Sequence, residues 1–227
     1  MSPFSLPKAM STKRSQISLS LESSGVIGII RMADATRLRD VTDALVAGGL
    51  RALEVTMTTP GAVDLIRALA PTLPPDFVLG AGTVTDAETV TRVFDAGAKF
   101  VVSPVFRRSV IEACHHHDVP ALPGCFTPTE ILDAWEAGAD IVKVFPATAV
   151  GPGYIRDVLA PLRQVKLMPT GGVTVDNAGD WIRAGAVAVG LGSALLDPKA
   201  IAANDFEAIA ALARRAMASV AAARGAR

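Results

Sequence analysis

Residues 137–146 read Ala-Gly-Ala-Asp-Ile-Val-Lys-Val-Phe-Pro, which is the pattern of a helix end followed by a buried strand. The glycine supplies the left-handed residue that ends a helix, and the apolar, β-branched run after it is typical of a strand in a parallel sheet. Lys143 places an amine inside this run. Burial disfavours the charged form of lysine, so this amine is expected to be paired or to act in its neutral form, as in Schiff-base chemistry. In the competing interpretation, Lys143 lies at a strand end and extends its amine into solvent.

The helix end at Gly138 is one of a series along the chain. Similar segments occur at 47–49 (Ala-Gly-Gly), 96–98 (Ala-Gly-Ala) and 184–186 (Ala-Gly-Ala). The chain alternates eight times between an apolar run and a helix-length segment. The apolar runs, which we expect to be strands, are 26–32, 52–58, 77–84, 100–105, 120–126, 141–145, 166–170 and 186–191. Eight βα units predict an α/β fold of the (β/α)8 TIM barrel type, formed by a single domain.

A doubly wound open sheet is the alternative to the barrel. It would carry a Gly-x-Gly-x-x-Gly turn after its first strand, where this chain has Arg-Met-Ala-Asp at 31–34. The barrel is therefore favoured, and we expect it to occupy residues 25–227. Residues 1–24 contain Ser, Lys and Arg but no acid before Glu22, and we expect them to form an N-terminal segment that is loosely or only partly ordered.

The composition favours small-molecule chemistry. The 227 residues are half hydrophobic and include 22 basic and 22 acidic side chains. A neutral chain without a basic run lacks the electrostatic footprint of a nucleic-acid-binding protein, and no apolar stretch reaches the ~18 residues of a membrane helix. Cys114 and Cys125 form no C-x-x-C pair, which fits a reducing compartment. We therefore expect a cytoplasmic protein with a small-molecule substrate and no nucleic-acid or membrane partner.

The second predicted strand contains a carboxylate, Glu54, between two apolar neighbours. By the two-residue period of a strand, Glu54, Thr56 and Thr58 share one face, which we expect to be the barrel interior. A buried carboxylate and a buried lysine in one barrel can cooperate. Lys143 would hold a carbonyl substrate as an iminium while Glu54 moves protons. The alternative is a glutamate at a strand start that faces water.

Glycine-rich segments follow the last two predicted strands, as Pro-Thr-Gly-Gly at 169–172 and Gly-Leu-Gly-Ser at 190–193. Glycines there let backbone N–H groups approach an anion, and barrels often hold phosphate at these two positions. Thr83, at the end of the third strand, is placed to hydrogen-bond a substrate carboxylate or carbonyl. The three consecutive histidines at 115–117 diverge around a helix, so no metal site is expected.

Seven short motifs then occur in a recognisable order between about residues 25 and 196. They are LEVT (53–56), GAGTV (80–84), VSP (102–104), PG (123–124), VKVFPA (142–147), PTGGV (169–173) and GLGS (190–193). In this order they resemble the 2-keto-3-deoxy-6-phosphogluconate (KDPG) aldolases, which share a family with the 4-hydroxy-2-oxoglutarate (KHG) aldolases. The resemblance implies a class I aldolase without a metal or other cofactor. It also implies a homotrimer that cleaves the keto-deoxy sugar acid to pyruvate and a phosphorylated aldehyde, glyceraldehyde 3-phosphate.

The resemblance implies a role for each matching position. Lys143 is similar to the Schiff-base lysine and Glu54 to the general acid/base. The implied substrate-binding residues are Thr83 at the pyruvate carboxylate, Pro104 and Phe145 as walls of the pyruvate pocket, Gly171, Gly172 and Ser193 as the phosphate cradle, and Thr170 and Gly192 beside that cradle.

The chain departs from part of this family at Thr58. Some members carry an arginine there that helps to bind the substrate carboxylate, whereas others carry a hydroxyl there and an arginine at the end of strand one. Arg31 occupies that second position here. We therefore expect Arg31 to contact the carboxylate, and we count Thr58 among the substrate-binding residues. The alternative is that Arg31 is a surface residue.

Two other functions stay open. A sister specificity would use the galactonate-derived epimer or an unphosphorylated 4-hydroxy-2-oxoacid, because segments 124–128 and 151–155 occur in similar form in the galactonate branch. A phosphate-binding isomerase, or a non-catalytic sugar-phosphate-binding barrel, would need the glycine-rich loops but no buried lysine.

Overall fold

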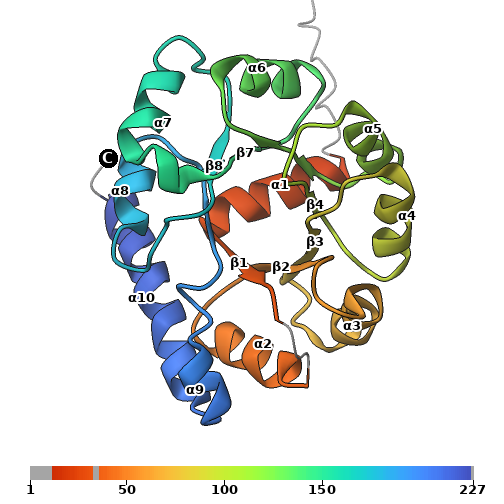
Figure 1. The fold of residues 1–227 in the computed structure, drawn as a ribbon, viewed down its shortest axis with the longest axis vertical. Coiled ribbons are helices and arrows are strands. Elements are labelled where there is room, and N and C mark those ends of the chain that lie inside the picture. Colours follow the sequence, from red (N-terminus) through yellow and green to blue (C-terminus); the bar gives the residue numbers. More distant parts are fainter. Residues whose placement is uncertain (1–11, 33–35, 226–227) are drawn as a thin grey trace, which may run out of the picture.

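The strands form two parallel sheets in the computed structural model, which describes residues 12–32 and 36–225 (Figure 1). The larger sheet has the order β5-β4-β3-β2-β1-β9, and the smaller one has the order β6-β7-β8. The strands are β1 Val26–Ile30, β2 Ala52–Thr56, β3 Val78–Gly82, β4 Val101–Val102, β5 Ala121–Leu122, β6 Gly124–Cys125, β7 Val142–Val144, β8 Leu167–Pro169 and β9 Val189–Leu191.

The helices lie around the strands except for α1, which precedes β1 and crosses the middle of the view (Figure 1). They are α1 Lys13–Ser24, α2 Leu38–Ala47, α3 Ala62–Leu69, α4 Ala87–Asp95, α5 Arg108–His116, α6 Pro128–Glu136, α7 Pro152–Leu159, α8 Ala178–Arg183, α9 Pro198–Ala202 and α10 Phe206–Gly225, with short 3-10 helices at Ala70–Thr72 and Ala147–Ala149. Within residues 12–32 and 36–225, no helix has the length and apolar character needed to span a lipid bilayer. The alternation of strands and helices confirms the predicted α/β fold class.

Each of the eight predicted strand ranges contains at least one observed strand, although the observed strands are shorter. The range 120–126 is divided at Pro123 into β5 and β6, because proline has no N–H group to donate to a ladder. Its carbonyl still accepts a hydrogen bond from the Lys143 N–H at 2.9 Å. A parallel bridge between Thr170 and Gly190 links the end of β8 to β9. The strands therefore form a curled parallel arrangement with helices outside, which is a TIM-like fold.

Along each strand, side chains point alternately outward to the helices and inward to the inner face of the curled sheets. On β2, Leu53 and Val55 belong to the apolar cluster that packs against the helices, whereas Ala52 belongs to a smaller inner cluster. Glu54 and Thr56 are buried and share the parity of Ala52, so they lie on the inner face, as predicted. Thr58 is exposed and lies in the turn after β2, because the strand ends at Thr56. The prediction that Thr58 shares the interior with Glu54 is therefore wrong.

The helix ends follow the predicted glycine series. Gly49, Gly97, Gly138 and Gly185 have φ values of 94°, 105°, 96° and 117°, a backbone conformation that residues with a β-carbon adopt only at a cost. At the other end of a unit, the Thr127 hydroxyl accepts a hydrogen bond from the Glu130 N–H, and the Glu130 carboxylate accepts one from the Thr127 N–H. This capping box fixes where α6 begins.

Helix α1 was not predicted, because residues 1–24 were expected to form a loosely or partly ordered segment. Residues 1–11 lie outside the described residues, but Lys13–Ser24 is helical and begins at a Thr12 N-cap. Leu21 and Ile17 are buried in the inner cluster, together with Ala52 and Val78 at the starts of β2 and β3. Helix α1 therefore covers the end of the inner face where the strands begin.

Candidate active site

Two ionisable side chains, Glu54 and Lys143, lie on the inner face where apolar residues would be expected. Their relative exposures are 1 % and 6 %, respectively. Glu54 is on β2, whose neighbours are β1 and β3, and Lys143 is on β7, between β6 and β8. The alternative interpretations, a lysine and a glutamate that extend into water, do not agree with this burial.

The two groups influence each other's protonation. Burial raises the pKa of Glu54, although the positive charges of Lys143 and Arg31 act in the opposite direction. Burial also lowers the pKa of Lys143, and Arg31 lowers it further, while the Glu54 carboxylate opposes this change. Lys143 is therefore biased toward its neutral, nucleophilic form, and Glu54 toward its protonated form.

The surroundings of the pair leave both groups available to a ligand. Oε2 of Glu54 is buried and has no hydrogen-bond partner in the structure. Nζ of Lys143 lies 5.0 Å from the centroid of the Phe145 ring, which extends from the residue after next on the same segment. A carbonyl compound placed between these groups could therefore meet an amine, an acid/base and an aromatic wall.

A cavity of about 360 Å³ opens at the ends of β1, β8 and β9, and Phe145, whose ring lies near Nζ of Lys143, forms part of its wall. It brings together seven of the predicted substrate-binding residues, namely Arg31, Phe145, Thr170, Gly171, Gly172, Gly192 and Ser193. Gly171 and Gly172 have φ values of 87° and 73°, so the backbone turns sharply at this point. Sharp glycine turns of this kind can present N–H groups to an anion.

Thr170 occupies the boundary between the cavity and the inner face. Its side chain is 6 % exposed, and its hydroxyl has no hydrogen-bond partner in the structure. A buried hydroxyl without a partner costs free energy, so the position suits a ligand that supplies a hydrogen bond.

Arg31 connects the cavity with the buried pair. It lies directly after β1, lines the cavity, and its charge acts on both Glu54 and Lys143. The Arg31 side chain is exposed, as the alternative interpretation has it, but it lines the cavity, where it could pair with an anionic part of a ligand.

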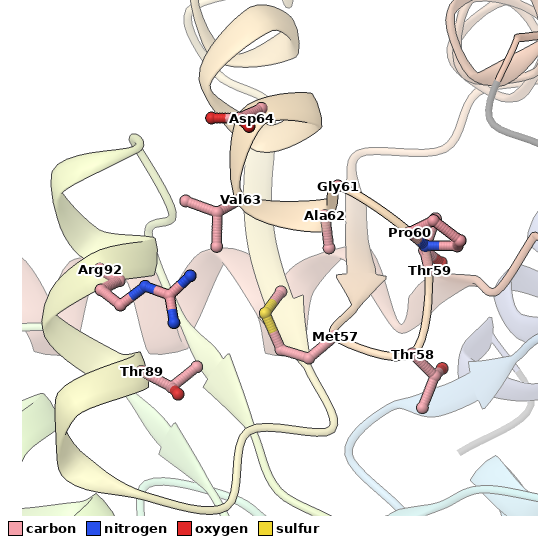
Figure 2. Close-up of a pocket in the computed structure, with 10 residues that line it drawn as sticks. All are labelled: Met57, Thr58, Thr59, Pro60, Gly61, Ala62, Val63, Asp64, Thr89 and Arg92. Carbon is pink, nitrogen blue, oxygen red and sulfur yellow. The ribbon is translucent and has the colours of Figure 1, made fainter.

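Thr58 lies in a different place from Arg31. It lines a separate cavity of about 380 Å³ between the β2–α3 turn and α4. Figure 2 shows Arg92 reaching from α4 toward Met57 and Val63, with Thr58 farther along the turn. The Thr58 hydroxyl is hydrogen-bonded to that of Thr56, with 2.9 Å between the oxygens. Arg31 therefore lines the cavity that contains Phe145 and the glycine-rich turn, and Thr58 does not.

Two further predicted residues, Thr83 and Pro104, follow the next two strands after β2, which are β3 and β4. Thr83 comes directly after β3 and has a φ of 59°, a left-handed conformation that is costly for a β-branched residue. Such strain is concentrated at functional sites. Pro104 follows β4, and its carbonyl group lies against Gly124, the register partner of Lys143. Neither residue lines the cavity that contains Arg31.

Several residues that line the Arg31 cavity were not predicted. They are Ile29, Val173, Gly190, Leu196 and Pro198. Apolar side chains near strand ends look the same in a sequence whether they belong to the core or to a ligand site. For Ile29 the strand parity was a usable signal, because it shares the inward parity of Ile27 on β1.

Comparison with known proteins gives consistent matches. Residues 17–212 match the family model described as KDPG and KHG aldolase. The 2-dehydro-3-deoxy-phosphogluconate aldolase of Treponema pallidum is 37% identical over 193 residues, which are 85% of this chain and 90% of that protein.

Solved structures of about 31% identity extend this similarity to the fold. A native KDPGal structure aligns with a TM-score of 0.81 over 88% of this chain and 96% of its own. The KDPG aldolase of Legionella pneumophila, with pyruvate captured at low pH as a covalent carbinolamine intermediate, aligns with a TM-score of 0.80 over 87% and 96%.

A TIM-like fold with a lysine and a carboxyl group buried on its inner face defines, together with these relatives, a lyase of the class I aldolase type. Such an enzyme holds its carbonyl substrate on a lysine as a Schiff base. The chain belongs to the KDPG and KHG aldolase family.

Proposed function

We propose that this enzyme cleaves 2-keto-3-deoxy-6-phosphogluconate to pyruvate and glyceraldehyde 3-phosphate through a Schiff base on Lys143. The observation that carries the proposal is the buried pair of Lys143, with a lowered pKa, and Glu54, with a raised pKa. The neighbouring cavity contains a cation, Arg31, and a glycine-rich turn. A keto acid that ends in a phosphate has an anionic group at each end, which suits this distribution.

The reaction can be followed through the two buried groups. The neutral amine of Lys143 attacks the C2 ketone, and loss of water gives an iminium. Glu54 removes the proton of the C4 hydroxyl, the C3–C4 bond breaks, and its electrons neutralise the iminium to give an enamine while the aldehyde leaves. Glu54 then returns the proton to C3, and water hydrolyses the resulting pyruvate iminium. In synthesis the same steps run in reverse.

The remaining predicted residues are proposed to hold the two ends of the substrate. Arg31 and Thr83 would contact the carboxylate, and Pro104 and Phe145 would enclose the pyruvate portion. Thr170 would meet a substrate hydroxyl, because its own hydroxyl is buried without a partner. The phosphate would lie at Gly171, Gly172, Gly192 and Ser193. The three glycines have no β-carbon to keep an anion away from the backbone N–H groups, and Ser193 adds a side-chain hydroxyl.

The alternative specificities differ at C4 and at the phosphate. A C4 epimer presents its hydroxyl in another direction to Thr170, and an unphosphorylated 4-hydroxy-2-oxoacid leaves the glycine-rich turn without an anion. The similar KDPGal structure keeps the epimer a serious candidate. A catalytically silent sugar-phosphate binder would have no use for a buried lysine next to a buried carboxyl group.

Pyruvate release from four substrates tests the proposed specificity. The substrates are the gluconate- and galactonate-derived acids, each with and without the 6-phosphate, and Lys143→Arg is the control for catalysis by other proteins. We expect the highest kcat/KM with the phosphorylated gluconate-derived acid and no turnover by the variant. A higher kcat/KM for the epimer or for an unphosphorylated acid would replace the proposed substrate, and no turnover of any of the four would favour a binding protein.

We further propose that the eight strand regions close into a (β/α)8 barrel of one domain and that the protein is cytoplasmic. Cys114 and Cys125 are both free thiols, as expected in a reducing compartment.

We also propose that three copies form a homotrimer. Val105 and Phe126 are 45% and 37% exposed, and a neighbouring copy would cover them. Light scattering should give three times the chain mass of 23.5 kDa, and a monomer mass would contradict the trimer.

A further inference from the structure

The backbone conformation of Gly82, at the end of β3, does not require a glycine. Its φ lies outside the left-handed range, so a residue with a side chain could adopt the same conformation. It pairs in register with Thr56 on β2, two residues after Glu54. The reason for glycine must therefore be sought in the space around its Cα atom.

That space is taken by the catalytic carboxyl group. A β-carbon built on Gly82 would meet the Glu54 side chain, at Oε1, at Cδ (2.7 Å) and at Cγ (3.2 Å), and these are its three nearest atoms. Contacts this short cannot be tolerated, so the carboxyl group of Glu54 would have to move. The carboxyl group occupies the volume that a side chain at position 82 would fill.

Gly80, two residues earlier on the same strand, shows the contrast. It is the register partner of Glu54, but a β-carbon there would meet the Phe100 ring, with Cδ1 and Cζ both at 2.5 Å. Phe100 belongs to the inner apolar cluster. Gly80 therefore makes room for core packing, whereas Gly82 makes room for an active-site group.

Among the residues that the structure describes, Oε2 of Glu54 has no hydrogen-bond partner. The shape of the space beside Gly82 therefore helps to set where the carboxyl group lies. We propose that Gly82 is a positioning residue that sets where the Glu54 carboxyl group stands relative to the substrate carbon held on Lys143. This role rests on the proposed aldolase activity, because it needs Glu54 to move the C3 proton.

Two measurements separate the steps of Lys143 and Glu54. Reduction by borohydride in the presence of pyruvate reports Schiff-base formation at Lys143. Exchange of the pyruvate methyl protons in D2O, followed by NMR, reports proton transfer by Glu54. A misplacement of about 1 Å can cost ~10²-fold in rate, so we expect Gly82→Ala to lower the exchange rate by about that factor while borohydride trapping stays close to that of the wild type.

The control is Gly80→Ala, whose added methyl group has its three nearest atoms in the Phe100 ring rather than in Glu54. We expect it to lower the thermal midpoint without separating exchange from trapping. In a Glu54→Gln background, Gly82→Ala should cause no further loss of exchange, because the group that it displaces is no longer a base. The same loss in both backgrounds would overturn the positioning role, as would wild-type exchange in Gly82→Ala.

A second variant covers the case in which Gly82→Ala alone does not fold. Glu54→Asp shortens the side chain by one methylene and frees part of the contested volume, so the double variant should recover folding and a measurable rate of methyl-proton exchange. A double variant that stays unfolded, or that shows no such recovery, would overturn the proposal. If the wild type itself gives no trapped adduct with pyruvate, the proposed aldolase function fails instead.

Discussion

Glu54 carries a stability cost that depends on pH. Burial raises its pKa above the ordinary value of 4.5, so the folded state binds the proton more tightly than the unfolded state does. The stability that the protonated carboxyl group contributes is fully present below pH 4.5 and is lost as the pH rises through the folded-state pKa. We expect Glu54→Gln to raise the free energy of unfolding at pH 7 and to change it little at pH 4, as measured by urea titration.

The exposed Glu136 provides the matched control on α6, where the same substitution should be nearly neutral at both pH values. A Glu54→Gln variant that is less stable than the wild type at pH 7 would show that the ionised carboxylate is stabilised in the fold. That result would contradict the assignment of burial as the dominant effect on its pKa.

Arg31, expected at the substrate carboxylate, and Thr58, expected to bind substrate, line different cavities. A hydrogen bond to a charged group contributes about 1.5–3 kcal/mol, so Arg31→Ala should raise KM for the keto acid roughly 10- to 100-fold and affect kcat less. Steady-state kinetics of Arg31→Ala and Thr58→Ala decide between the two residues. An unchanged KM in Arg31→Ala, with a raised KM in Thr58→Ala, would reverse the assignment.

Among single residues, the sequence indicated a role most clearly where a side chain differed in polarity from its neighbours. Lys143 and Glu54 could be identified because a charge in an apolar, β-branched run needs an explanation. Ile29 and Leu196, which line the Arg31 cavity, could not, because apolar side chains at strand ends look like core. Gly82 belongs to the GAGTV motif, but the motif does not show that Gly82 lies against Glu54, because that depends on the register between β2 and β3.

Among the elements, α1 makes the clearest contribution to stability outside the site. Leu21 is fully buried in the inner cluster, whereas Leu19 on the same helix is 60% exposed. Leu21→Ala should lower the free energy of unfolding by about 2–5 kcal/mol, because it leaves a cavity in a packed core. Leu19→Ala should change it by less than about 0.5 kcal/mol. Equal effects of the two substitutions, measured by denaturant titration, would contradict the packing of α1 seen here.

Most elements could be predicted because each is encoded locally. The glycine series marks the helix ends, and the apolar runs between them contain the strands. Helix α1 could not be predicted in this way. Its buried apolar residues are Ile17 and Leu21, in a serine-rich segment, so the sequence shows no clear apolar stripe, and the two side chains are buried only by packing against the strands. The turn after β2 was also missed, since Thr58 continues the alternation of Glu54 and Thr56 without belonging to the strand.

For the whole molecule, the two ends of the strands have separate roles. Helix α1 covers the end where the strands begin, and the candidate substrate-binding residues follow the ends where they finish. This is the usual division in TIM-like enzymes, in which the loops after the strands carry the chemistry. Substitutions on α1 are therefore expected to change stability while the folded fraction keeps its activity.

The central claim is that Lys143 forms a covalent bond with the substrate carbonyl, and reductive trapping tests it most directly. The enzyme is treated with pyruvate and borohydride, digested, and mapped by mass spectrometry, with Lys143→Arg and the exposed Lys199→Arg as paired variants. We predict one reduced pyruvate adduct, on the peptide that contains Lys143, in the wild type and in Lys199→Arg, and none in Lys143→Arg. An unmodified Lys143, or an adduct on another lysine, would contradict the claim.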